Sequence, residues 1–155
     1  LDLFLVGLHD EQAGNQLADH GVVGQLAPQR QQHLKGVGGV VFHRVIQGFM
    51  AQTGDPTGTG MGGSNLPDLE AEFSDAQFTR GTLGMARSAS PNSANSQFFI
   101  VTADAAHLNG QYTLFGEVIE GMEFVDAIEQ GDPRNNGMVT NPDQMISLRV
   151  TPVEQ

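Results

Sequence analysis

Arg44 is the residue whose setting in this sequence is most suggestive of chemistry. It stands in the apolar run 42–46, and Phe49, Met50 and Gln52 follow after a glycine. A guanidinium that projects beside an aromatic ring can donate hydrogen bonds to a bound substrate. The same pattern describes an arginine at a sheet edge that reaches solvent over an aromatic ring. From the local sequence alone, the solvent-exposed arginine is the favoured interpretation.

A second junction of polar and apolar residues lies at 90–100. Small, turn-forming residues run into Gln97, and three large apolar side chains follow at 98–100. Gln97 is then either the first residue of a strand or, with Phe99, part of the lining of a cleft. In the second case, the polar loop before Gln97 forms the rim of that cleft. Composition does not separate the two interpretations.

The glycine run 58–63 matches G-x-G-x-x-G, a pattern found in dinucleotide sites. Such a site needs the run to stand between a strand and the first turn of a helix. Here Asp55 and Pro56 precede the run, and residues 64–67 follow it without a helical period. We therefore expect a close-packed surface loop rather than a nucleotide site.

Other reactive side chains show no catalytic spacing. The five histidines form no short-spaced metal pair, so we expect no metal. Glu70 and Glu72 lie two residues apart in an extended segment, and we do not expect them to form a catalytic carboxylate pair. No serine lies in a G-x-S-x-G turn, which disfavours that hydrolase chemistry.

Composition sets the class of protein. The 155 residues suit one domain, 1–155, and the net charge of −11 disfavours nucleic acid and anionic membranes as partners. The absence of cysteine excludes disulfides and thiolate chemistry. No apolar run is long enough for a membrane helix. The early run 3–6 is short and lacks a basic flank, so we expect a cytoplasmic protein. An N-terminal signal missing from the sequence would instead indicate the periplasm.

The elements that must position Arg44 and Gln97 are short strands. The helical spacing of Met122, Val125 and Ile128, with Gly131 as a stop, predicts a helix over 122–130. Residues 1–39 show no sustained period, and only 26–28 suggest the start of a helix, over 29–34. Many short strands between turns indicate a mainly β sandwich or barrel. The predicted strands are 40–46, 78–85, 97–102, 112–119 and 145–150, and the first of these would put Phe42 and Arg44 on one face.

Several runs together resemble bacterial-type cyclophilins, which are peptidyl-prolyl cis-trans isomerases. The resemblance covers residues 40–150 and implies a closed eight-stranded antiparallel barrel capped by two helices, with an active groove on its outer face. It implies no cofactor, a monomer, and proline-containing peptides and unfolded proteins as partners. The matching runs are 42–50, 54–60, 84–87, 96–100 and 115–122.

Carried over by position, the resemblance makes Arg44 the catalytic arginine. Gln97, with Gln52, matches the polar groups that hold the substrate backbone, and Phe99 matches the pocket for the proline ring. Arg44, Gln97 and Phe99 form the predicted catalytic set. The predicted substrate-binding residues are His43, Phe49, Met50, Gln52, Ala86, Arg87, His107, Leu108 and Tyr112.

This sequence departs from the family pattern in three places. Thr53 replaces a usual glycine, and His107 stands where many relatives have tryptophan, so we expect weak or no cyclosporin binding. Residues 1–39 should supply two strands and the first helix, yet only 27–28 and 39–41 look family-like. Divergence, truncation or a frame shift would each explain this. The alternative function is a proline-peptide-binding module of the same fold without catalysis.

Overall fold

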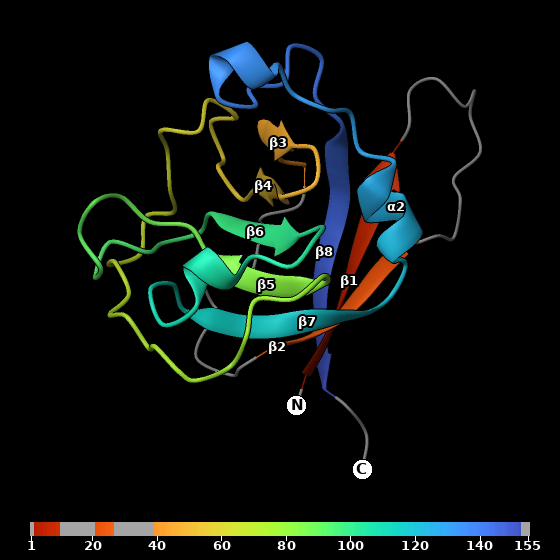
Figure 1. Cartoon of the computed structure of the whole chain (residues 1–155). Helices are drawn as coiled ribbons and strands as arrows, with labels where there is room; N and C mark the ends of the chain where they lie inside the picture. Colours follow the sequence, from red (N-terminus) through yellow and green to blue (C-terminus); the bar gives the residue numbers. More distant parts are fainter. Residues whose placement is uncertain (1, 10–20, 27–38, 153–155) are drawn as a thin grey trace.

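The computed structural model describes residues 2–9, 21–26 and 39–152 and is built mainly from β-strands, as predicted (Figure 1). In these residues, no helix is long and apolar enough to cross a membrane. The helical elements are η3 Ala106–Leu108, α2 Met122–Asp126 and η4 Pro133–Asn135. The strands are β1 Asp2–His9, β2 Gly21–Leu26, β3 Arg44–Ile46, β4 Met50–Thr53, β5 Thr82–Met85, β6 Phe98–Val101, β7 Leu114–Glu120 and β8 Gln144–Pro152.

The strands form one antiparallel sheet of eight in the order β3-β4-β6-β5-β7-β2-β1-β8. In the described residues, no ladder joins the outer strands β3 and β8. The segment before β3 instead bonds to the start of β8, through Met145 N to Val40 O at 2.8 Å and Gly39 N to Met145 O at 2.6 Å. Closure into the barrel implied by the resemblance stays a prediction.

The predicted strands correspond to β3, β5, β6, β7 and β8, but the first two begin four residues later than predicted, at Arg44 and Thr82. Residues 40–43 lie outside any strand, and Phe42 packs into the core with Val45. Arg44, in contrast, lines a surface pocket. The prediction that Phe42 and Arg44 share one face is therefore wrong, because strand alternation starts only at Arg44. The sequence interpretation also missed β4, whose four residues follow directly after a turn.

The helix predicted over 122–130 is shorter than expected. It ends at Asp126, and Ile128 N already bonds to Val125 O in the tighter geometry of a turn. The next amide, Glu129 N, bonds to the carboxylate of Asp143 at 2.7 Å instead of continuing the helix. Val125 and Ile128 are nevertheless buried, so the helical spacing identified the inward-facing residues.

The N-terminal region contributes β1 and β2, the two strands that the family pattern requires there. β1 pairs with β2 on one side and with β8 on the other, and β2 pairs with β7. Partners distant in the sequence thus order these strands, which explains why no local period predicts them. The helix predicted over 29–34 lies outside the described residues.

A separate cluster of apolar side chains underlies the surface pocket that contains Arg44. It consists of Met50, Phe78, Phe99, Val101, Ala105 and Leu108. Gly84 pairs with Phe99 across β5 and β6, and a Cβ at Gly84 would collide with the Phe99 and Phe78 rings. The glycine therefore lets the Phe99 ring lie flat against its neighbouring strand.

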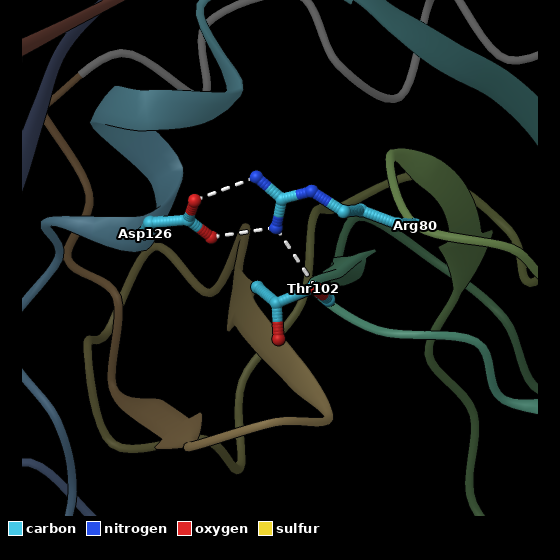
Figure 2. A network of polar contacts seen from close by, with 3 residues as sticks. All are labelled: Arg80, Thr102 and Asp126. Atoms are coloured by element: carbon cyan, nitrogen blue, oxygen red, sulfur yellow. Dashed lines mark hydrogen bonds and ion pairs between the residues drawn. The ribbon is translucent and has the colours of Figure 1, made fainter.

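An ion pair outside this pocket ties α2 to the sheet (Figure 2). The Arg80 guanidinium donates to both carboxylate oxygens of Asp126, at 2.8 and 2.6 Å, and to Thr102 O at 2.9 Å. Both side chains are partly exposed, so the pair adds little stability by itself. Its hydrogen bonds join the last residue of α2 to Thr102, the residue that follows β6.

Candidate active site

One pocket collects most of the predicted site residues. It has a volume of about 450 Å³ and receives Arg44 from β3, Met50 and Gln52 from β4 and Phe99 from β6. All the predicted site residues line it except His43 and Gln97, and Asn136 lines it without having been predicted. The lining consists of Arg44, Phe49, Met50, Gln52, Ala86, Arg87, Phe99, His107, Leu108, Tyr112 and Asn136.

Aromatic rings give the pocket a rigid apolar floor. Phe99 is 5% exposed and stacks on Phe78 with ring centroids 5.9 Å apart. Tyr112 meets Phe99 edge-on with ring centroids 5.8 Å apart, and the Phe49 and His107 ring centroids lie 5.0 Å apart. Such contacts hold rings in fixed orientations. A pocket of this kind suits a compact apolar ring such as that of proline.

The Arg44 guanidinium is held from two sides at the edge of this floor. Nε donates to Asn136 O at 2.9 Å and Nη2 to Asn136 Oδ1 at 3.0 Å, while Nη1 donates to Gln52 Oε1 at 3.2 Å. Because a guanidinium has five N–H groups, one on each Nη remains for a ligand. Burial lowers the pKa of Arg44, and Tyr112 opposes that effect. An arginine keeps its charge under such conditions.

Gln97 stands behind Gln52 rather than in the pocket wall. Its Oε1 accepts from Gln52 Nε2 at 2.9 Å, and its Nε2 donates to Gly60 O at 3.1 Å and Gly62 O at 2.8 Å. The amide is thus fully engaged with the protein. Gln97 orients Gln52, which in turn orients Arg44.

His43 is buried and supports a loop instead of lining the pocket. Its exposure is 3%, and its ring packs under Gly60, where a Cβ would lie 3.0 Å from the ring. Its Nδ1 has no hydrogen-bond partner in the described residues. Burial lowers the pKa of His43, the nearby Arg44 charge adds to this, and Asp55 opposes it. The ring is therefore neutral at neutral pH.

The glycine loop 58–63 binds a carboxylate of the protein itself. Asp55 is completely buried and accepts from Gly60 N at 2.6 Å, Gly62 N at 3.1 Å and Thr57 N at 2.8 Å. In a nucleotide site, amides of this kind would bind phosphate. No helix follows the loop in the described structure at 61–105. The loop is a structural support for Gln97, as its two bonded carbonyls show.

Ala86 and Arg87 follow directly after β5, which is separated from the Arg44 strand β3 by β4 and β6 in the sheet. Ala86 N donates to Gln97 O at 3.0 Å, which continues the pairing of β5 with β6. The Arg87 guanidinium lies 4.5 Å from the centre of the Tyr112 ring and donates to Gln111 O at 2.8 Å. Both contacts fix the long side chain along the pocket. Among the described residues, no cluster of acidic and histidine side chains suits a metal ion.

Comparison with known proteins gives a consistent result. A family model described as cyclophilin-type peptidyl-prolyl cis-trans isomerase matches residues 16–150. A probable peptidyl-prolyl cis-trans isomerase of Brucella abortus is 55% identical over 123 residues, covering 72% of this chain and 63% of the relative. Peptidyl-prolyl cis-trans isomerase-like 3 of Rattus norvegicus is 49% identical over 96 residues, 59% of each chain. This chain thus spans less than two thirds of either relative's length.

Solved structures give the same fold. A cyclophilin-type isomerase of Cryptosporidium parvum has a TM-score of 0.79 at 23% identity and covers 99% of each chain. The cyclophilin AquaCyp293 of Hirschia baltica has a TM-score of 0.75 at 21% identity, covering 95% of this chain and 73% of its own. At these identities, the likeness concerns the fold.

Proposed function

The chain belongs to the cyclophilin-type peptidyl-prolyl cis-trans isomerases, and we propose that it accelerates rotation about X-Pro peptide bonds in unfolded or flexible chains. The observation that carries this proposal is the state of Arg44. Its guanidinium is fixed by three hydrogen bonds and keeps two N–H groups free beside an apolar ring pocket. No cofactor or covalent intermediate is needed for the reaction.

The reaction needs a modest acceleration by enzyme standards. Nitrogen shares its lone pair with the carbonyl, which gives a rotation barrier of about 18–20 kcal/mol. Unaided exchange takes tens to hundreds of seconds. Exchange in milliseconds requires a factor of about 10⁴–10⁵, or about 5.5–7 kcal/mol.

Arg44 supplies part of this energy by binding the twisted state. When the peptide bond twists, the lone pair localises on the proline nitrogen, which becomes a better hydrogen-bond acceptor. A free N–H of Arg44 then bonds the transition state more strongly than the planar ground state, as catalysis requires. One preorganised donor contributes about 2.7–4 kcal/mol.

The apolar floor and the amides supply the remainder. Phe49, Met50 and Phe99 exclude water and hold the proline ring, while the carbonyl before it swings. Gln52 lies in the wall, where it holds Arg44 and faces the substrate backbone, and Gln97 fixes Gln52 from behind. Ala86 and Arg87 form the strand edge along which the peptide lies.

We extend the proposal to the architecture and partners. The sheet closes into an eight-stranded barrel capped by two helices, an arrangement supported by the bonds between the flank of β3 and the start of β8. The protein acts as a monomer on proline-containing peptides and unfolded proteins. Its cyclosporin binding is weak or absent, because His107 offers a smaller surface than the tryptophan of many relatives.

The test is exchange NMR on a short Ala-Pro peptide with the wild type, Arg44→Ala and Arg134→Ala. Arg134 is a control because its side chain is 91% exposed and outside the pocket. We expect Arg44→Ala to lower kcat about 10²–10³-fold and Arg134→Ala to leave it unchanged. Equal activity of all three proteins would contradict the role of Arg44. Peptide binding by a folded wild type without faster exchange would instead identify a binding module.

A further inference from the structure

Asn136 has an unusual backbone. With a φ of 54°, it is the one non-glycine residue in the described part of the chain with a positive φ. Left-handed geometry costs residues with a Cβ roughly 1–2 kcal/mol, although asparagine tolerates it better than most. Glycine would adopt this geometry more easily, as Gly137 does next to it with a φ of 75°. A side chain retained in such a position suggests a use for that side chain.

Ending a helix explains only the backbone of Asn136. It follows η4 as the C-terminal cap, a place where glycine and asparagine are common. None of the bonds that close this turn uses the Asn136 side chain: the Asp132 carboxylate accepts from Arg134 N at 2.9 Å, Asp132 N donates to Met138 O at 3.0 Å, and Gly137 N donates to Asp132 O at 2.9 Å. A glycine at position 136 would therefore complete the same turn.

Main-chain hydrogen bonds fix the turn against the edge of β3 that does not pair with β4. Val45 N donates to Gly137 O at 2.8 Å, and Gly131 N donates to Val45 O at 2.9 Å. Val139 N donates to His43 O at 3.1 Å. These bonds hold the segment 131–139 on both sides of Arg44. Asn136 is thus presented to the guanidinium by a framework that does not depend on its own side chain.

Asn136 holds the guanidinium with two atoms. Its carbonyl oxygen accepts from Nε and its Oδ1 accepts from Nη2, so one residue binds a whole edge of the Arg44 plane. Gln52 Oε1 binds the third nitrogen from β4. Without Oδ1, Nη2 would lose its hydrogen bond, and two bonds instead of three would hold the guanidinium. The two N–H groups free for substrate would then be less firmly directed.

We propose that Asn136 is a positioning residue that fixes the direction of the Arg44 N–H donors through its side-chain oxygen. This inference rests on the proposed isomerase function, in which Arg44 bonds the twisted proline nitrogen. Preorganised donors act because they require no rearrangement as the reaction proceeds. We therefore expect Asn136 to contribute to kcat rather than to KM, because Phe49, Met50 and Phe99 hold the proline ring.

The experiment compares three variants by exchange NMR on the Ala-Pro peptide. Asn136→Gly keeps the left-handed backbone and removes only the side-chain acceptor. Asn136→Asp keeps an acceptor in the same place. Asn135→Ala changes the neighbouring residue, which does not line the pocket. We expect Asn136→Gly to lower kcat about tenfold with KM unchanged, the worth of one hydrogen bond to a charged group. Asn136→Asp should keep the donors in place but also lower kcat, because its negative charge would offset that of Arg44. Asn135→Ala should retain full activity.

A second measurement follows Arg44 directly and does not depend on activity. In ¹⁵N spectra of the side chain, hindered rotation about the Nε–Cζ bond gives Arg44 separate Nη signals. We expect separate signals in the wild type, Asn136→Asp and Asn135→Ala, and one averaged signal in Asn136→Gly. A wild type without isomerase activity would refute the proposed function, whereas these spectra would still test the positioning. Unchanged kcat or unchanged Nη signals in Asn136→Gly would overturn the inference about Asn136.

Discussion

Asp55 gives the fold a pH-dependent stability that can be measured. Its carboxylate lies fully buried under the glycine loop. Burial alone would raise its pKa, but the hydrogen bonds from Gly62, Thr57 and Gly60 outweigh burial and lower the pKa from 3.8 to about 2. The ionised form is therefore favoured by folding. Its contribution is present above pH 3.8 and is lost as the pH falls through about 2.

The size of this contribution follows from the difference between the two pKa values. From 3.8 to about 2 is a difference of about 1.8, and each pKa unit corresponds to about 1.36 kcal/mol. Ionised Asp55 thus adds about 2 kcal/mol to the free energy of unfolding at neutral pH. A contribution of this size is a large share of the stability of a small domain.

The measurement is urea unfolding of the wild type and Asp55→Asn between about pH 6 and pH 2. Other acidic residues titrate in both proteins, so the difference between their unfolding free energies isolates Asp55. We expect the wild type to be the more stable protein at pH 6, and this advantage to shrink by about 2 kcal/mol as the pH reaches 2. A constant difference across this range would refute the argument that loop amides stabilise the ionised carboxylate.

Two further predictions concern the residues behind the pocket. Gly84→Ala would press a Cβ into the Phe99 and Phe78 rings, so we expect a higher KM and a loss of about 1–3 kcal/mol in urea unfolding. An unchanged KM would show that the ring is not held by this close approach. Gln97→Leu removes the acceptor for Gln52 and the donor to two loop carbonyls, so kcat measured by exchange NMR should fall about threefold to tenfold. Wild-type kcat in that variant would show that Gln52 needs no support.

The parts of the site that the sequence predicts are those with a local signature. Arg44 in an apolar run and Gln97 before three apolar residues are visible in a few neighbouring residues. The resemblance then assigned most of the pocket lining, which the structure brings together. Asn136 escaped because its partner Arg44 lies 92 residues away in the chain. Gly137 in the sequence indicates a turn at this place, but no local pattern indicates that the turn lies against Arg44.

Local patterns also failed where distant groups decide the structure. Phe42 was expected beside Arg44 because alternation was counted from residue 40, whereas the strand begins only at Arg44. The helix from Met122 ends early because the distant carboxylate of Asp143 takes the amide of Glu129. β1 and β2 lack a period of their own and are ordered by pairing with β7 and β8. For the helix end and for β1 and β2, the deciding contact joins residues that are not neighbours in the sequence.

The arginines inside and outside the pocket differ in the kind of group that accepts their hydrogen bonds. Arg80 and Arg134 each pair with an aspartate, as Figure 2 shows for Arg80. Arg44 and Arg87 instead bond to carbonyl and amide oxygens, and no acidic residue lines their pocket, although the chain carries a net charge of −11. A carboxylate beside Arg44 would take its N–H groups and cancel its charge. Neutral acceptors hold the guanidinium in place while they leave its charge available to the proline nitrogen, which is the condition for binding a twisted peptide bond.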